Sequence, residues 1–293
     1  MLKPGCNSIT FCLWILIGVF SSNVVKGQNQ CVNESSKIPI SLQISHELIL
    51  HGMLKLPPNL KPNQKVPVLL VFGGFESADR VLDLIHINIP IALASFDYPF
   101  DAPRRIRFPQ SFPSLFQARQ LFPQTMKGIQ ELIRLLKQRA EIDSSQMIIV
   151  GASFGAPFAL AAASEFPEIQ GLVIVHGFGL VAETVENVIL RSWLPKYGNL
   201  IRPLAWIFSH LGWTYLGLKT PEELTTNLRH GQRVLMITAE SDSFIPRRSS
   251  DSLWNALTRS HAQVTRRLMK SDHLMPGSDH LIAEIIELIQ DWM

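Results

Sequence analysis

Short, continuous apolar runs recur along the chain and alternate with stretches of helical period. The runs at 67–74 (PVLLVFGG), 91–98 (IALASFDY) and 146–152 (QMIIVGA) lack the polar alternation of a half-exposed strand, which predicts strands buried on both faces. Further runs of this kind lie at 171–179, 233–239 and 262–270, and helices are predicted at 123–140, 154–165, about 250–259 and 279–293. Strands alternating with helices indicate an α/β fold with a mostly parallel central sheet and helices on both faces.

Three stretches depart from this alternation. The segments 38–45 and 47–56 read as a pair of β-like segments closed by prolines. Residues 99–122 are rich in Pro and Arg without a clear period, so we predict a loop there and a helix that begins at Pro123. The connection at about 180–232 is unusually long and aromatic, and it is predicted to be a helical cap insert.

Composition excludes two broad classes of protein. Hydrophobic residues make up 46% of the 293 residues and charged residues 17%, which is enough apolar surface for a large core and excludes a disordered chain. The formal net charge is +3, and Lys3 and Lys26 lie in an N-terminal stretch without acidic residues. The rest of the chain is therefore close to neutral, and we expect no nucleic-acid partner.

Residues 1–27 have the pattern of a signal peptide. Lys3 precedes an apolar run at 9–20, which is followed by small or polar residues and a predicted cleavage site after Gly27. The run is short for a membrane span of about 20 residues. We expect a secreted or periplasmic protein, with an uncleaved signal anchor as the alternative. Only Cys31 would remain after cleavage, so no internal disulfide is expected.

The sequence Gly151-Ala152-Ser153-Phe154-Gly155 matches the pattern G-x-S-x-G, and it lies where a predicted strand gives way to a predicted helix. A strand–elbow–helix is the geometry this motif needs, since the glycines permit a tight turn that exposes the serine hydroxyl. Here the chain resembles the α/β-hydrolase superfamily, over roughly residues 40–293. The resemblance implies one such domain after the leader, at 28–293, and a serine–acid–histidine triad in that chain order.

Two further residues match the positions that the resemblance implies. Asp242 follows the strand at 233–239 in a turn similar to the family pattern D-x-x-[VI]-P, although it could instead cap the following helix. His273 lies in the loop after the strand at 262–270, and we favour it over His280 at the start of the last helix. Ser153 would attack a carbonyl carbon, His273 would transfer the proton, and Asp242 would orient and stabilise the imidazole.

An oxyanion would need two backbone donors. The N–H of Phe154, at the start of the helix, is predicted to be one. The loop after the strand at 67–74 offers the second, which we assign to the N–H of Phe75, with Gly74 as the alternative. The dipeptide HG that is common in the superfamily is absent, because Phe72 replaces the histidine.

These residues predict hydrolysis of a carboxylic ester, or of a thioester or amide, through an acyl-enzyme. The substrate is expected to be a small molecule with an apolar portion, because the predicted cap is aromatic. No CxxC pair or P-loop occurs, so we expect neither a metal nor another cofactor. Acyl transfer, peptidase activity on the same triad, and a non-catalytic binding protein of the same fold are the alternatives.

Three other patterns are weaker. Residues 177–182 (GFGLVA) match a dinucleotide-binding pattern, but no acidic residue and no strand follow at the required distance. His46 and His51 resemble a zinc motif with one residue too many between them. The apolar stretch at 200–218 is interpreted as a cap helix over the active site, and a membrane-surface helix is the alternative.

Overall fold

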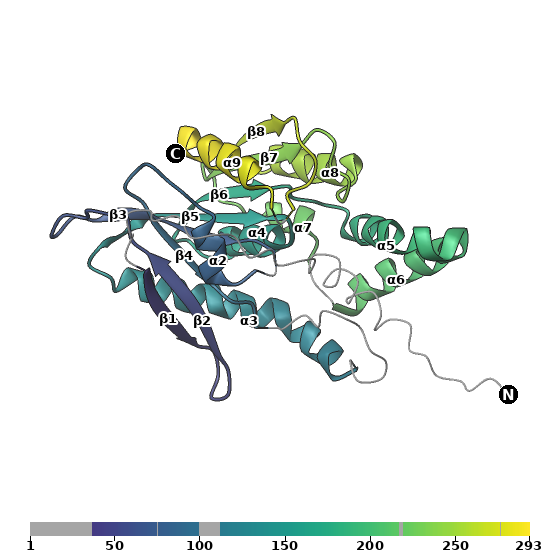
Figure 1. Ribbon diagram of the computed structural model, residues 1–293, viewed down its shortest axis with the longest axis horizontal. Helices are drawn as coiled ribbons and strands as arrows, with labels where there is room; N and C mark the ends of the chain where they lie inside the picture. Colours follow the sequence, from purple (N-terminus) through teal and green to yellow (C-terminus); the bar gives the residue numbers. More distant parts are fainter. Residues whose placement is uncertain (1–36, 75, 100–111, 217–218, 276) are drawn as a thin grey trace.

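The computed structural model describes residues 37–74, 76–99, 112–216, 219–275 and 277–293. Within them the chain forms one eight-stranded sheet in the order β1-β2-β4-β3-β5-β6-β7-β8 (Figure 1). The strands are β1 (Lys37–Gln43), β2 (Ile49–Lys55), β3 (Val66–Phe72), β4 (Ala92–Phe96), β5 (Ile142–Ala152), β6 (Ile169–Val175), β7 (Arg233–Ala239) and β8 (Gln263–Met269). The predicted α/β fold with a mostly parallel sheet is confirmed.

The two edges of the sheet differ. At one edge β1 pairs antiparallel with β2, and β2 pairs antiparallel with β4. From β4 to β8 every pairing is parallel. Because the carboxyl ends of parallel strands lie at one edge of the sheet, the loops after β3, β5, β7 and β8 can meet there.

The central strands are buried on both faces, as their apolar runs predict. In β5, Met147 and Ile149 pack into one apolar cluster, while Ile148 and Val150 pack into the cluster on the opposite face. This division follows from the two-residue period of a strand, in which successive side chains point to opposite faces.

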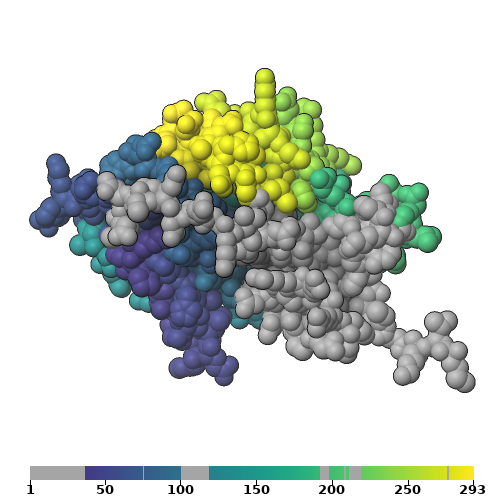
Figure 2. Space-filling view, viewed as in Figure 1, coloured from purple at the N-terminus to yellow at the C-terminus, as the bar shows by residue number. Residues whose placement is uncertain are grey.

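Helices cover both faces of this sheet (Figure 1). The first cluster is covered by α3 (Phe112–Lys137), α4 (Ala156–Glu165) and α8 (Arg247–Thr258). The second is covered by α2 (Ala78–Asp83) and α9 (Asp279–Trp292). Figure 2 shows the yellow C-terminal segment against blue residues from much earlier in the sequence. One hydrogen bond between such distant segments is donated by the Asn88 N–H to the side chain of Gln290 in α9.

Helix α3 begins earlier than its sequence predicts. The predicted loop at 99–122 is wrong for residues 112–122, and Pro123 lies inside the helix rather than at its start. An internal proline costs one backbone hydrogen bond and about 3 kcal/mol. Tertiary packing offsets this cost on the N-terminal side, where Leu121 is buried and the ring of Phe122 stacks on Phe158 at 5.2 Å.

The long connection between β6 and β7 forms α5 (Val181–Tyr197), a 3₁₀ turn (Gly198–Leu200), α6 (Ile201–Leu216) and α7 (Pro221–Thr225). Helices α5 and α6 share a small apolar cluster of their own, to which Phe244 and Ile245 also belong. Helix α7 packs instead on the main core through Leu224. The insert therefore contacts the loop after β7, which carries one of the predicted site residues.

Helix α6 is only partly covered. Ile201 and Ala205 are buried, whereas Leu204 and Trp206 are exposed. The prediction of a helix is thus confirmed, but its apolar surface is not wholly buried as a simple cap would require. In the described part of the chain, no helix has both the length and the apolar character needed to cross a membrane.

Candidate active site

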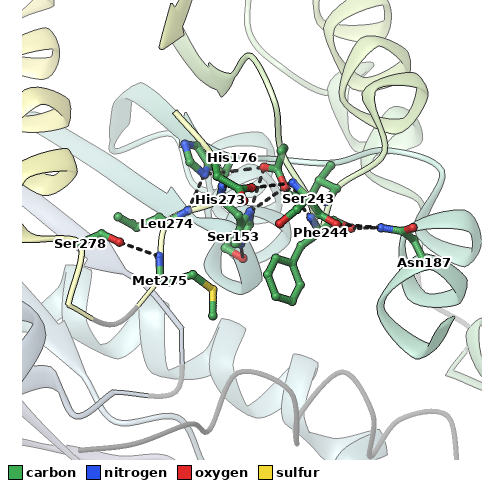
Figure 3. Close-up of polar contacts among 12 residues, drawn as sticks. Ser153, His176, Asn187, Ser243, Phe244, His273, Leu274, Met275 and Ser278 are labelled. Atoms are coloured by element: carbon green, nitrogen blue, oxygen red, sulfur yellow. Dashed lines mark hydrogen bonds and ion pairs between the residues drawn. The ribbon is translucent and has the colours of Figure 1, made fainter. Parts of the chain in front are cut away.

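Ser153 stands at a sharp turn between β5 and α4. The strand ends at Ala152, a 3₁₀ turn covers Ser153–Gly155, and α4 begins at Ala156. Ser153 has a φ of +50°, a left-handed conformation that is costly for a residue with a side chain and is typical of functional turns. Its side chain is directed to the edge of the sheet where the loops after β7 and β8 lie (Figure 3).

The two glycines of the motif are required by close backbone approach. A Cβ atom on Gly151 would lie 2.5 Å from the Cβ of Ala159, so this glycine lets α4 pack directly on β5. A Cβ atom on Gly155 would lie 2.1 Å from the carbonyl oxygen of Phe72 at the end of β3. The second glycine therefore brings the loop after β3 against the serine turn.

Ser153, His273 and Asp242 form one hydrogen-bonded line. The Oγ of Ser153 lies 2.9 Å from Nε2 of His273. The Nδ1 of His273 lies 2.8 Å from Oδ2 and 3.0 Å from Oδ1 of Asp242. Figure 3 shows Ser153 and His273 facing one another, and the His273 side chain is fully buried. His280 lies instead on α9. The structure thus brings the three predicted residues together, and their catalytic roles remain predictions.

The carboxylate of Asp242 also orders its own turn. Its Oδ1 accepts the N–H groups of Phe244 at 2.9 Å and Ile245 at 2.8 Å. Burial acts to raise the pKa of Asp242, but the hydrogen bond and the charge interaction with His273, together with the Ile245 N–H, lower it overall. Helix α8 is capped at Pro246 without a side-chain hydrogen bond, so Asp242 does not serve as its cap.

Asp272 ties the two loops of this line together, and sequence reasoning missed it. Its Oδ1 accepts the N–H of Ser243 at 2.7 Å and the N–H of His273 at 2.6 Å. Burial acts to raise the pKa of Asp272, but these backbone donors outweigh it and lower the pKa. A carboxylate directly before a candidate histidine was the only available signal.

The insert also contacts the turn that carries Asp242, called the acid turn below. Asn187 of α5 donates through Nδ2 to the Phe244 carbonyl at 2.7 Å, as Figure 3 shows. Arg191, one helical turn further on, places its guanidinium 4.7 Å from the centre of the Phe244 ring. That ring lies 5.2 Å from the imidazole of His273. No pattern in the sequence predicts these contacts, because they join an insert to a loop more than 50 residues away.

The predicted oxyanion donors are only partly described. Phe75 lies outside the described residues. Phe154 directly follows Ser153 in the 3₁₀ turn that leads into α4. A Cβ on Gly74 would meet nothing within 4 Å. Tyr98 connects the loop after β3 with the serine turn. Its hydroxyl donates to the Gly73 carbonyl at 3.0 Å, and its ring centre lies 5.4 Å from that of Phe154.

Comparison with known families identifies the chain. Residues 106–270, more than half of its length, match the dienelactone hydrolase family. The chain belongs to the dienelactone hydrolase family. The matched segment includes Ser153 and Asp242 but ends just before Asp272 and His273, so it covers two members of the hydrogen-bonded line.

A curated relative of this family member is the alpha/beta hydrolase psoB of Aspergillus fumigatus, which is 28% identical over 203 residues. The match covers 59% of this chain and 44% of the relative, so this chain spans less than half of the fungal protein's length.

Solved structures agree on the fold of this dienelactone hydrolase family member. Acetyl xylan esterase 1 from a Thermoanaerobacterium species superimposes with a TM-score of 0.56 at 14% identity, covering 98% of this chain and 95% of the esterase. An acylaminoacyl peptidase superimposes with a TM-score of 0.57 at 16% identity, covering 87% of this chain and 40% of the peptidase. At such identities the likeness shows the fold alone.

A cluster of possible metal ligands lies at the same site as the hydrogen-bonded line. His176, Asp242 and His273 each offer a ligand atom, all within 4.8 Å of one another. The Nδ1 of His273 and the carboxylate of Asp242 already bond to each other. A metal held there would therefore break the hydrogen-bonded line of Ser153, His273 and Asp242.

The glycine pattern at 177–182 has another explanation. The N–H of Leu180, just before α5, donates to Oε1 of Glu222 at 2.8 Å. The same oxygen would lie 2.1 Å from a Cβ on Gly179. A carboxylate of the protein itself therefore lies where a dinucleotide phosphate would bind in such a motif.

Proposed function

We propose that this protein is a serine hydrolase that cleaves a carboxylic ester through an acyl-enzyme on Ser153. The observation that carries the proposal is the continuous line Ser153 Oγ–His273 Nε2 and His273 Nδ1–Asp242 Oδ2, at 2.9 and 2.8 Å. The family match and the ester-hydrolysing structural neighbours support the same reaction class.

In the proposed reaction Ser153 Oγ attacks the ester carbonyl carbon while Nε2 of His273 takes the hydroxyl proton. The imidazolium so formed is stabilised by the carboxylate of Asp242, whose lowered pKa keeps it ionised at neutral pH. The tetrahedral intermediate collapses as the same proton passes to the leaving alcohol. Water then attacks the acyl-enzyme with His273 as base, which releases the acid and restores Ser153.

The backbone N–H groups of Phe154 and of Phe75 or Gly74 would bind the oxyanion. Support for this arrangement comes from Gly155, whose missing side chain lets the Phe72 carbonyl approach the serine turn. Donors placed where charge develops typically contribute about 3 kcal/mol to transition-state stabilisation.

The substrate is proposed to carry an apolar portion. Several aromatic rings lie near the nucleophile. Phe154 follows it directly, and the centre of its ring lies 5.4 Å from the ring centres of both Tyr98 and Phe158. We expect a higher kcat/KM for p-nitrophenyl esters of medium acyl chains than for the acetate. A monotonic fall of kcat/KM with chain length would contradict this.

A fluorophosphonate probe tests the central proposal. It should label the wild-type protein and fail to label the Ser153→Ala variant, which should also lose ester hydrolysis. Absence of labelling in a folded wild-type protein would favour the non-catalytic alternative. Release of free acid, compared with transfer to an added alcohol, separates hydrolase from acyltransferase, and a matched amide substrate tests peptidase activity.

Export is proposed from the N-terminal sequence. Residues 1–27, which lie outside the described residues, have the order of a signal peptide, with the apolar run at 9–20. Protein recovered from the secreted or periplasmic fraction should begin near Gln28. Protein that remains in the membrane fraction with its original N-terminus would indicate an uncleaved anchor instead.

A further inference from the structure

A second histidine lies beside the hydrogen-bonded line, and the proposed reaction does not use it. His176 follows the last residue of β6, the strand between those that lead to Ser153 and Asp242. Its side chain is fully buried, and its ring lies 5.2 Å from that of His273. Figure 3 shows it on the side of His273 away from Asn187.

The hydrogen bonds of His176 define its protonation state. Its Nδ1 accepts the N–H of Leu274 at 3.0 Å, so Nδ1 carries no proton and the ring is the neutral Nε2–H tautomer. Burial, followed by the nearby charge of His273, lowers the pKa of His176 to about 4, although Asp242 and Asp272 act to raise it. At neutral pH the ring is therefore an acceptor toward Leu274.

Neutrality matters because Nδ1 of His176 also lies 3.7 Å from Oδ2 of Asp242. A protonated Nδ1 would donate to this oxygen and compete with His273 for it. The unprotonated nitrogen leaves Oδ2 to His273 alone. His176 can thus approach the acid closely without diverting it.

Two features of His176 work against stability. Its φ is +48°, in the left-handed region that is unfavourable for a residue with a side chain. Its Nε2 is buried without a hydrogen-bond partner among the described residues, and such a donor loses its hydration without compensation. A residue that only filled space here would be apolar, so these costs point to a use for the ring acceptor.

We propose that His176 is a positioning residue that holds the Leu274 backbone and thereby fixes the imidazole of His273 between Ser153 and Asp242. The chain on the other side of His273 is held by Asp272, which accepts the His273 N–H. The histidine is then restrained from both neighbouring peptide groups. This role rests on the proposed function, and His176 transfers no proton in it.

Two variants of the full chain distinguish the role of the His176 hydrogen-bond acceptor from that of its aromatic ring. His176→Asn keeps an oxygen acceptor near the position of Nδ1 and tolerates a positive φ. His176→Phe keeps the ring and removes the acceptor. We expect the phenylalanine variant to lose about 10- to 100-fold in kcat, at an unchanged KM, and to react with a fluorophosphonate more slowly in the same proportion. The asparagine variant should stay within about threefold of wild type, as expected when one acceptor replaces another.

Equal loss in both variants would overturn the proposal, because it would mean that the imidazole itself takes part in the reaction. Unchanged kcat in both would overturn it as well. If the phenylalanine variant does not fold, His176→Ala removes the acceptor without steric demand and takes its place. Melting temperatures identify a change in kcat that follows from global unfolding alone.

A readout without turnover keeps this proposal separate from the proposed function. The proton shared by His273 Nδ1 and Asp242 should give a downfield NMR resonance in the wild type and in the asparagine variant. We expect it to shift or broaden when the acceptor is removed. An identical resonance in all variants would contradict the positioning role, even if the wild-type protein proved to have no esterase activity.

Discussion

Gly155 lies so close to Phe72 that a Cβ atom on the glycine would stand 2.1 Å from the Phe72 carbonyl oxygen. This contact joins the serine turn to the end of β3, and hence to the loop that is proposed to complete the oxyanion hole. The two parts of the site come from segments about 80 residues apart in the chain.

Gly155→Ala should therefore separate these two parts. We expect a loss of stability of about 2 to 4 kcal/mol, as for overpacking against backbone that cannot move aside, and a fall in kcat of at least about 100-fold. Urea unfolding and ester hydrolysis measure the two effects. Gly73→Ala is the control for stability, because its Cβ would lie 3.8 Å from the nearest heavy atom. Equal stability of the two variants would contradict the close approach.

Asp272→Ala should disturb the hydrogen-bonded line without removing any of its three side chains. The variant leaves the N–H groups of Ser243 and His273 without their common acceptor. Hydrogen bonds to a charged acceptor contribute about 1.5 to 3 kcal/mol each, so we expect a drop of about 10- to 100-fold in kcat/KM. Asp272→Asn retains an oxygen acceptor and should recover much of the activity. If the alanine variant kept full activity, Asp272 would have no positioning role.

Asn187→Ala tests whether the insert supports the acid turn. The variant removes the donor to the Phe244 carbonyl, and we expect kcat to fall by about three- to tenfold, corresponding to one net hydrogen bond of about 1 kcal/mol. Glu186→Ala is the matched control, since adjacent helical residues point about 100° apart. Loss of the same size in both variants would indicate a general effect on α5 rather than a specific contact.

The buried His176 makes stability depend on pH. Its pKa is about 4 in the folded protein and about 6.5 in an unfolded chain. Below pH 6.5 the unfolded chain binds a proton that the folded protein does not. The stability due to this group is therefore complete above pH 6.5 and is lost as the pH falls toward 4. The difference corresponds to about 3 kcal/mol.

Urea unfolding at pH 7 and at pH 4.5 measures this loss. The wild-type free energy of unfolding should fall more steeply between these values than that of His176→Asn, which has no imidazole at this position. The pKa of Asp242 is lowered, so this carboxylate stays ionised throughout that window. Parallel decreases in both proteins would show that His176 is not the group responsible.

Local patterns of the sequence determined the sheet and the order of the site residues. The apolar runs predicted all the parallel strands, although β5 begins at Ile142 rather than at 146. Residues 143–146 are polar, so the apolar run does not include the start of the strand, where Ile142 pairs with Val66. G-x-S-x-G was found from its place between a strand and a helix, and Asp242 and His273 from the positions that the resemblance to α/β hydrolases implies. Each of these residues follows a strand, and parallel strands bring such positions to one edge.

Only the tertiary structure decided how these residues are held. Pro123 lies within a helix because contacts of Leu121 and Phe122 outweigh its local preference. The supporting roles of His176, Asp272 and Asn187 depend on hydrogen bonds between loops that are distant along the chain. A strand or a helix is set by the periodicity of neighbouring residues, but such bonds depend on the direction of two backbones in space, which no local pattern encodes.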